Sequence, residues 1–333
     1  MTTPKRILSG MRPTGPLHLG NYHGALANWV DMQDRYDCFF FIADWHALTS
    51  DYENPGSIST FVHEMMIDWL SAGLSPDKST LFVQSLVREH AELFLILSMI
   101  TPVPWLERNP TYKDQIIQLE NKDLSTFGFL GYPVLQAADI IMYKANGVPV
   151  GIDQVPHVEI TREIARRFNF LYGNVFPEPE AILTPTSKIL GLDRRKMSKS
   201  YHNAIYLSDT PETIAAKVAT MITDPNRARR KDPGNPDICN VFEFHKLYSP
   251  PETVNRVNRE CRSAEIGCVE CKNLMAGNLI EALKPIRDKR AYYEAHPRLV
   301  KDIMMAGSDR ARAVARQTMD EVRAAIKLKL NLA

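Results

Sequence analysis

The sequence predicts an α/β protein, with a doubly wound parallel sheet in its first part and an all-helical region in its second. Over roughly the first 200 residues, short apolar runs of strand length alternate with amphipathic stretches of helical length. After Ser200 the composition becomes helical, which places a domain boundary near residue 200. At 333 residues and 44% hydrophobic, the chain is long enough for one large domain and a smaller one.

The first two predicted strands flank a helix. Residues 5–10 form the first strand, and residues 22–36 carry apolar side chains on one helical face. Residues 37–43 then form a continuous apolar run, which is typical of a parallel strand buried on both faces. Parallel strands present their carboxyl ends at one edge of a sheet, where ligands bind. Asp44 and His46, which follow the second strand, are therefore predicted to lie at that edge.

The pattern continues with a helix that starts at residues 54–55, where asparagine and proline supply a cap and a first-turn proline, and that stops at Gly73. Residues 81–83 are the next strand. Prolines and a glycine-bearing loop at residues 102–130 interrupt the alternation, which indicates an insertion. A helix is predicted for residues 131–143.

A short strand at residues 148–150 ends in Gly151 and leads into another helix. In the second part, a helix is predicted to begin at residues 210–211. Ser308 is expected to cap the last helix, which carries apolar side chains at three- and four-residue spacings.

Composition excludes several classes of function. A formal net charge of +1 implies no global attraction to DNA or membrane, so any RNA contact must be local, with the basic stretch 226–231 as a candidate phosphate site or a solvated loop. No apolar run is long enough to span a membrane, and no export signal is recognised, so we expect a cytoplasmic protein. Five cysteines in that setting indicate thiols or metal ligands, not disulfides.

Residues 9–21 read as a glycine-rich turn between a strand and a helix, the order that cradles nucleotide phosphates. Glycines 10, 15 and 20 allow close backbone approach, and the helix start offers free N–H groups. His18 and Asn21 add side-chain donors. Taken alone, this turn also fits an ordinary strand-to-helix connection with a core histidine.

Residues 196–200, Lys-Met-Ser-Lys-Ser, place two ammonium groups three positions apart with small hydroxyls between them. A mobile cationic loop of this kind is able to grip a polyphosphate, with lysine acting as a flexible point charge. Alone, it also fits a solvated basic turn.

Together the two motifs resemble the signatures of the class I aminoacyl-tRNA synthetases. His18-Leu19-Gly20-Asn21 departs at two positions from the usual His-Ile-Gly-His, as is common in the tyrosine and tryptophan branch, and residues 196–200 match the second signature unaltered. The resemblance implies a Rossmann-like catalytic domain at residues 1–200, whose insertion carries dimer contacts. It also implies a helical anticodon-binding domain at residues 201–333, whose last helix is able to pack back on the catalytic domain.

Asp139 lies among apolar residues of its predicted helix, and a buried carboxylate needs a donor. A capping or ion-pair aspartate is the alternative. In tryptophanyl-tRNA synthetases, which residues 148–169 resemble closely, the matching aspartate accepts the indole N–H. The amino acid site implied by the resemblance also contains Gly10, His46, Tyr132, Gln136 and Gln154, with Gln136 standing where many bacterial members have methionine.

The resemblance also implies an ATP site, in which Gly20 admits the adenine and His18 and Asn21 hold phosphates. Lys196 and Lys199, with Mg²⁺, stabilise the departing pyrophosphate. Ile152 stands where a glutamate is commoner, so only its backbone is able to contact ATP. Asp153 fits either a contact to the ribose or a helix cap. The full set is Arg12, Pro13, Thr14, Gly20, Asn21, Gly151, Ile152, Asp153, Ile189, Lys196, Met197, Ser198, Lys199 and Ser200.

Four cysteines gather in the second part, at positions 239, 261, 268 and 271. A close trio that contains Cys-x-x-Cys, plus one distant cysteine, is able to supply four thiolates to one site. An iron–sulfur cluster, zinc and unpaired thiols all remain open. A minority of tryptophanyl enzymes resemble this arrangement and hold a four-iron, four-sulfur cluster near the anticodon-binding region, which favours the cluster over zinc.

The expected function is therefore a tryptophan–tRNA ligase that uses ATP and Mg²⁺ and acts on L-tryptophan and tRNA(Trp) as a homodimer. No proofreading domain is expected, because a buried aspartate without its donor penalises phenylalanine. A tyrosine–tRNA ligase and a non-catalytic RNA-binding paralogue are the alternatives.

Overall fold

A five-stranded parallel sheet forms the centre of the computed structural model, which describes residues 4–109, 112, 125–184 and 189–328. The strand order is β3-β2-β1-β4-β5, so the direction of winding reverses between β1 and β4. The strands are β1 (Arg6–Met11), β2 (Asp37–Ile42), β3 (Ser79–Val83), β4 (Gly147–Val150) and β5 (Glu180–Leu183). The predicted doubly wound parallel sheet is confirmed, and β5 is the one described strand that the sequence analysis missed.

Alternate residues of the strands feed two separate cores. Ile7, Phe40 and Leu81 point to one face, and Leu8, Phe39 and their neighbours point to the other. The first face is covered by α1 (Leu19–Asn21), the π-helical turn Tyr22–Leu26, α2 (Ala27–Met32) and α4 (Ile58–Ala72). The second face is covered by α5 (Glu89–Ser98), α8 (Phe127–Met142) and α9 (Val155–Tyr172).

Three helix boundaries differ from those predicted. The helix expected at residues 22–36 starts at Leu19 and ends at Met32, because His18 caps it, and it contains a π-helical turn. The helix expected at residues 131–143 starts at Phe127, where the Thr126 hydroxyl accepts the N–H of Phe129 at 3.2 Å. The helix predicted from residues 54–55 follows a 3₁₀ turn, Pro55–Ser57, and ends as expected at Gly73, which has a positive φ of 116°.

The predicted insertion at residues 102–130 contains α6 (Val103–Glu107) and the start of α8. Residues 110–111 and 113–124 of this insertion lie outside the described part of the chain. Between β2 and α4, the short helix α3 (Asp44–Asp51) begins directly at the carboxyl edge of the sheet.

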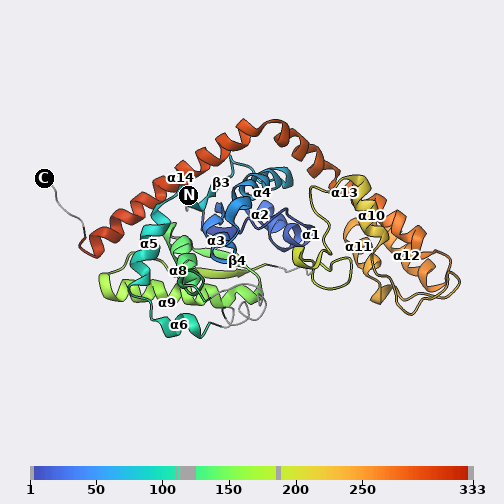
Figure 1. Cartoon of the computed structure of the whole chain (residues 1–333), viewed down its shortest axis with the longest axis horizontal. Helices are drawn as coiled ribbons and strands as arrows, with labels where there is room; N and C mark the ends of the chain where they lie inside the picture. Colours follow the sequence, from blue (N-terminus) through green and yellow to red (C-terminus); the bar gives the residue numbers. More distant parts are fainter. Residues whose placement is uncertain (1–3, 110–111, 113–124, 185–188, 329–333) are drawn as a thin grey trace.

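The second part of the chain is helical, as predicted. Its helices are α10 (Pro211–Ala219), α11 (Asn240–Tyr248), α12 (Pro251–Arg262), α13 (Cys268–Ala295) and α14 (Pro297–Ala325). Figure 1 shows α10 to α12 as a separate group beside the sheet, with α13 and α14 leading back over it. A buried charge cluster joins this helical part to the first part. Arg290 on α13 pairs with Asp68 and Glu64 on α4, and the Asp68 carboxylate also accepts the N–H of Leu17 at 3.3 Å.

Helix α14 runs over the sheet-containing part of the molecule and lies along the edge strand β3 (Figure 1). Gly307 approaches the strand so closely that an added Cβ would stand 1.8 Å from the carbonyl oxygen of Leu81. The Ser308 hydroxyl accepts the N–H of Val83 at 3.3 Å. The prediction that Ser308 caps the last helix is therefore wrong: this serine is buried in mid-helix, where it satisfies an edge-strand donor that the sequence does not reveal.

Candidate active site

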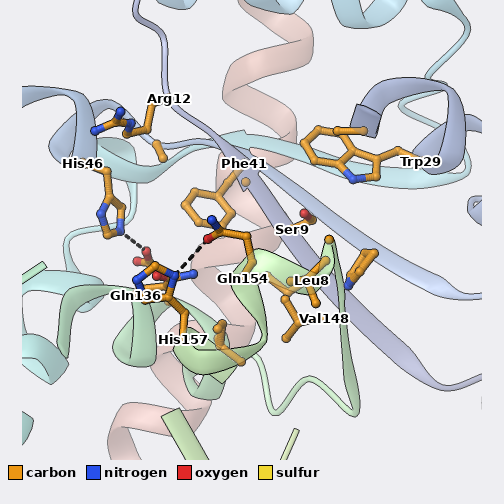
Figure 2. A pocket seen from close by; sticks show the side chains of 18 of the residues that line it. Leu8, Ser9, Arg12, Trp29, Phe41, His46, Gln136, Val148, Gln154 and His157 are labelled. Atoms are coloured by element: carbon orange, nitrogen blue, oxygen red, sulfur yellow. Dashed lines mark hydrogen bonds and ion pairs between the residues drawn. The ribbon is translucent and has the colours of Figure 1, made fainter. Parts of the chain in front are cut away.

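A cavity of about 420 Å³ opens at the carboxyl ends of β1 and β4, where the winding of the sheet reverses. Figure 2 shows β1 residues such as Ser9 facing Val148 of β4 across it, with His46 and Gln154 on its walls. Eight of the predicted site residues line this cavity: Gly10, His46, Tyr132, Gln136, Asp139 and Gln154 from the predicted amino acid site, and Arg12 and Gly151 from the predicted ATP site.

The first motif forms a tight turn that closes on itself. The Nδ1 atom of His18 accepts the N–H of Asn21 at 3.2 Å, and the Asn21 side-chain oxygen accepts the N–H of His18 at 3.1 Å. Burial, followed by the charge of Lys199, lowers the pKa of His18 to about 4, so the ring is neutral at pH 7. Because Nδ1 is an acceptor, the proton is on Nε2, and the ring presents one N–H donor. Gly20 is required here, since a Cβ would stand 2.9 Å from His18 Nδ1.

The second motif lies against the first. The chain after it pairs with the turn, with the N–H of Leu19 bonded to the carbonyl of Ile205 at 3.0 Å and that of Leu207 to the carbonyl of Leu17 at 2.9 Å. The Lys199 ammonium donates to the Gly15 carbonyl at 2.9 Å and lies 3.5 Å from the hydroxyl of Thr14.

The two lysines of this loop differ in their surroundings. Burial lowers the pKa of Lys199 from 10.5 to about 8, opposed by the attraction of Asp68. Lys196, by contrast, is exposed to solvent. The loop therefore presents one cation that is free to reach a ligand and one that rests on the first motif.

Buried side chains anchor the lysine loop. Met197 is 3% exposed, and its N–H bonds the carbonyl of Ile189, which is also buried. Asn203, which the sequence analysis missed, accepts the N–H of Ser198 at 2.8 Å and donates to Asp193. The Ser198 hydroxyl caps the following turn by accepting the N–H of Ser200 at 3.3 Å.

Asp139 is 0% exposed at the base of the cavity and accepts hydrogen bonds from three side chains. His46 Nε2 donates at 2.7 Å, His90 Nδ1 at 2.6 Å and Gln84 Nε2 at 2.8 Å. Although burial disfavours the charge, these donors lower the pKa of Asp139 below its usual value, so the carboxylate is ionised. The sequence analysis named His46 but missed Gln84 and His90, because nothing local marks residues 49 and 55 positions away as partners.

A second hydrogen-bonded chain also lines the cavity. The Tyr132 hydroxyl donates to His157 Nε2 at 2.8 Å. His157 Nδ1 donates to the Gln154 side-chain oxygen at 2.9 Å (Figure 2). Burial lowers the pKa of His157 to about 4, so this ring is neutral and fixed in one tautomer. The Gln154 amide is therefore held with its oxygen toward His157, while its nitrogen donates to Asp153 at 3.4 Å.

Two glycines shape the floor and entrance of the site. A Cβ on Gly10 would stand 2.5 Å from the ring of Phe41, so glycine lets that ring form the floor. Gly15 has a φ of +132°, and its missing side chain leaves room for Lys199.

Pro13, Thr14, Ile152 and Asp153, also predicted to bind ATP, are not among the residues that line the cavity. Arg12 and Thr14 are exposed and Pro13 is buried. Ile152 is 71% exposed, which suits a residue that serves only through its backbone. Asp153 is exposed beside Gln154, and helix α9 has no side-chain cap, so the capping alternative for Asp153 is not seen.

The four C-terminal cysteines are free thiols on three neighbouring elements. Cys239 precedes α11, Cys261 lies near the end of α12, and Cys268 and Cys271 open α13. Burial, with a further contribution from the other three thiols, raises the pKa of Cys271 to about 12. Within the described residues, no group of three or more His, Cys, Asp or Glu side chains is placed to hold a single metal ion.

The basic stretch 226–231 divides into two kinds of residue. Arg227, which is half-buried, and Arg230, which is exposed, donate to the carbonyls of Ile266 and Ala264 respectively. Arg229 and Lys231 are exposed. In addition, none of the helices described is both long and apolar enough to cross a membrane.

Comparison with known proteins places this geometry in a family. Residues 1–284 match the family model described as tRNA synthetases class I (W and Y). The chain is 52% identical to the tryptophan–tRNA ligase of Thermotoga maritima, over 97% of this chain and 99% of that one. It is 47% identical to the tryptophan–tRNA ligase of Aquifex aeolicus, over 97% and 100% of the two chains.

Solved structures agree. The tryptophanyl-tRNA synthetase of Campylobacter jejuni, complexed with ADP and tryptophan, superposes with a TM-score of 0.90 at 33% identity, over 97% of this chain and 99% of that one. A tyrosyl-tRNA synthetase from Archaeoglobus fulgidus shares the fold at 19% identity and a TM-score of 0.64. The two paired signature motifs, the parallel sheet and these matches together show that the chain belongs to the class I tRNA synthetases of the tryptophan and tyrosine branch.

Proposed function

We propose that this protein is a tryptophan–tRNA ligase, which forms tryptophanyl-adenylate and pyrophosphate from L-tryptophan and ATP and then charges tRNA(Trp). The observation that carries the proposal is the buried, ionised Asp139 at the base of a cavity that Gly10 and Arg12 line at the start of the first motif. The second motif lies against the first through the bond from Lys199 to the Gly15 carbonyl. An ionised carboxylate accepts hydrogen bonds and donates none, so it selects an aromatic side chain with a donor. The names of the relatives above support the same assignment.

In the first step, the tryptophan carboxylate attacks the α-phosphorus of ATP in line, and pyrophosphate leaves. The reaction needs little covalent help from the protein, so positioning and charge neutralisation dominate. Lys199, already beside the first motif, and the exposed Lys196 neutralise the departing pyrophosphate. Mg²⁺ enters with the ATP phosphates, which commonly supply its oxygen ligands.

The first motif holds the phosphates with neutral donors. His18 offers its Nε2 proton, and Asn21 keeps its amide nitrogen available because only its oxygen is used in the cap. At the other side of the cavity, the Gln154 amide nitrogen and Tyr132 orient the amino acid. In the second step, a ribose hydroxyl at the tRNA 3′ end attacks the adenylate carbonyl carbon, and AMP leaves.

Amino acid-dependent exchange between ATP and pyrophosphate tests this function directly. We expect exchange with tryptophan and none with phenylalanine, because a pocket built around a buried acceptor rejects side chains without a donor. Tyrosine, whose hydroxyl is also a donor, is compared because the names of the relatives favour tryptophan over it. Exchange with tyrosine alone would identify a tyrosine–tRNA ligase. Absence of exchange with either amino acid would favour the non-catalytic RNA-binding alternative.

A lysine pair sharpens the test. Lys199→Met is expected to lower kcat by about 10²-fold, the usual loss when one donor to a developing charge is removed. Lys301→Met, which removes an exposed charge from α14, serves as the matched control and should leave kcat unchanged. An equal effect of the two substitutions would contradict the assigned role of Lys199.

We further propose that Cys239, Cys261, Cys268 and Cys271 hold a [4Fe–4S] cluster. Four thiolates suit either a zinc ion or an iron–sulfur cluster, and among the described residues no such group is placed to hold a single metal ion. In a cluster, each thiolate binds a different iron. The donor set suits an anionic group, since Arg227 Nη1 lies 3.9 Å and 3.8 Å from the sulfurs of Cys261 and Cys268.

The cysteine proposal is tested by metal content. Cys268→Ser, purified without oxygen, is expected to lose iron and acid-labile sulfide and to loosen residues 239–271, while tryptophan-dependent exchange survives. Cys38→Ala, at a buried thiol in β2 outside the group, should keep the full iron content. Full iron content in Cys268→Ser, or stoichiometric zinc in the parent protein, would overturn the cluster.

The remaining proposals follow from the family. Residues 201–333 form the anticodon-binding part, with the exposed Arg229 and Lys231 available for phosphate. The protein works as a homodimer through the insertion at residues 102–130, and it acts in the cytoplasm. RNA binding by an Arg229→Ala variant tests the anticodon-binding role, and sedimentation measurements test the homodimer.

A further inference from the structure

The Asp139 carboxylate has no acceptor site to spare. A carboxylate offers about four lone-pair positions. Oδ1 accepts from His90 at 2.6 Å and from Gln84 at 2.8 Å, while Oδ2 accepts from His46 at 2.7 Å and from Gln84 at 3.0 Å. A ligand donor that bonds to this group must therefore take the place of one of the three side chains.

Two of the three donors are locked in place. The His90 ring is 0% exposed and uses both nitrogens, because the hydroxyl of Tyr143 bonds its Nε2 at 2.6 Å. Gln84 is also 0% exposed, and its side-chain oxygen accepts the N–H of Trp45 at 3.2 Å. Moving either residue would break bonds at both ends and leave buried polar atoms unpaired.

His46 differs from these two. It lies on α3 with its ring on the cavity wall, as Figure 2 shows, and it is 8% exposed. Its bond is to Oδ2, the oxygen that otherwise has only the longer Gln84 contact. Rotation of this ring exposes Oδ2 to the cavity without disturbing the bonds at Oδ1.

We infer that Gln84 and His90 are positioning residues, which hold Asp139 as a fixed, ionised acceptor, and that the amino acid's N–H displaces His46 from Oδ2. This inference rests on the proposed tryptophan ligase function and deepens it. Binding is then an exchange of one donor for another. A side chain of the same size without a donor still pushes His46 aside but leaves Oδ2 short of a hydrogen bond, and that deficit is the source of selectivity.

The hydroxyl of Tyr143 determines which nitrogen of His90 faces Asp139 as a donor. The Tyr143 hydroxyl, 0% exposed, donates to His90 Nε2, which leaves Nδ1 of the ring to donate to Asp139. A carboxyl buried without such donors takes up a proton and becomes a donor itself. It would then no longer demand a donor from the ligand.

The test compares L-tryptophan with β-(3-benzothienyl)-L-alanine, in which sulfur replaces the indole N–H at nearly the same size. The readout is the ratio of kcat/KM for the two amino acids in ATP–pyrophosphate exchange. We expect His90→Phe and Gln84→Glu each to reduce this ratio by roughly tenfold or more, since each compromises an ionised acceptor. His296→Phe, at an exposed position on the helical part, is the control and should keep the parent ratio.

A merely structural role lowers kcat/KM for both amino acids together and leaves the ratio unchanged, and that result would overturn the inference. If His90→Phe fails to fold, Tyr143→Phe is the second variant, because it keeps the His90 ring and removes only the hydroxyl that bonds it. We expect it also to reduce the ratio. A parent protein with no tryptophan-dependent exchange would refute the proposed function itself. A parent that discriminates while all three variants keep its ratio would refute the positioning roles alone.

Nuclear magnetic resonance of the histidine rings tests the displacement. Addition of tryptophan should shift the His46 ring nitrogens and leave those of His90 unchanged. A shift at His90 with none at His46 would show that the wrong donor was assigned to leave.

Discussion

Replacing Arg290 by methionine is expected to lower the unfolding temperature more at pH 8 than at pH 5. The Arg290 side chain is 8% exposed and that of Asp68 is 2% exposed, so the substitution leaves a buried carboxylate without its cation. Asp68 then keeps only the N–H of Leu17 at 3.3 Å as a donor among the bonds described above. Such a group takes up a proton instead of remaining charged.

The size of the effect follows from proton linkage. Burial already raises the pKa of Asp68 to about 6, against the opposing attraction of Arg290, whereas an unfolded aspartate has a pKa near 3.9. The folded state therefore binds more protons than the unfolded state, and stability falls as the pH rises through this window. In the parent protein the fall ends near pH 6. In the variant it continues upward, at about 1.4 kcal/mol per pH unit.

If Asp68 stays protonated to pH 8, the variant loses about 2.7 kcal/mol more than the parent between pH 6 and pH 8. At about 2–4 °C per kcal/mol for a large domain, this corresponds to roughly 5–10 °C. Scanning calorimetry at pH 5 and pH 8, at matched ionic strength, measures it. Arg166→Met removes an exposed ion pair on α9 and should change little at either pH.

The double variant Asp68→Leu/Arg290→Met completes the cycle. Replacing both members of a buried pair with apolar side chains is often neutral or stabilising, so the pH dependence should disappear and much of the stability should return. An Arg290→Met effect of equal size at both pH values, or a double variant as unstable as the sum of the singles, would refute this reasoning.

Three further outcomes are expected. Gly307→Ala should cost about 2–3 kcal/mol of unfolding free energy, because the new methyl meets the backbone carbonyl of Leu81. Gly277→Ala, on the same kind of helix but with open space around it, should be stabilising by about 0.5–1 kcal/mol. Chemical denaturation measures both changes. The KM for ATP should rise above pH 8 as Lys199, whose pKa is lowered to about 8, loses its charge, and Lys199→Arg should remove that rise; an unchanged KM up to pH 9.5 would contradict it. Ser308→Ala should cost about 1–3 kcal/mol by leaving an edge-strand N–H unpaired, and amide hydrogen exchange of that strand should speed up.

The parts of the fold that the sequence predicted are those with a local signal. The strands β1 to β4 are apolar runs or lie beside glycine-marked turns, and the two signature motifs are contiguous. The strand β5 was missed because it is an edge strand, with its end residues Glu180 and Leu183 exposed, so it shows no buried run.

Side chains that act through distant partners were not predictable in this way. Gln84 and His90 meet Asp139 across 55 and 49 residues, and Arg290 meets Asp68 across 222. Ser308 was read as a cap from its residue type alone, because the strand that its hydroxyl serves lies 225 residues earlier. Only the tertiary fold brings these groups together, and no periodicity in the sequence indicates that they are in contact.

The position of α14 along the edge of β3 bears on how the protein is made. Roughly 220 residues separate Val83 from Gly307, so at about 5–20 residues per second a ribosome adds the covering helix some 10–45 s after the strand. Until then, the nascent sheet offers a row of unpaired backbone groups to any other extended chain. Synthesis that stops short of α14 therefore releases a chain with a template for aggregation, and chaperones have the greatest work to do during that interval.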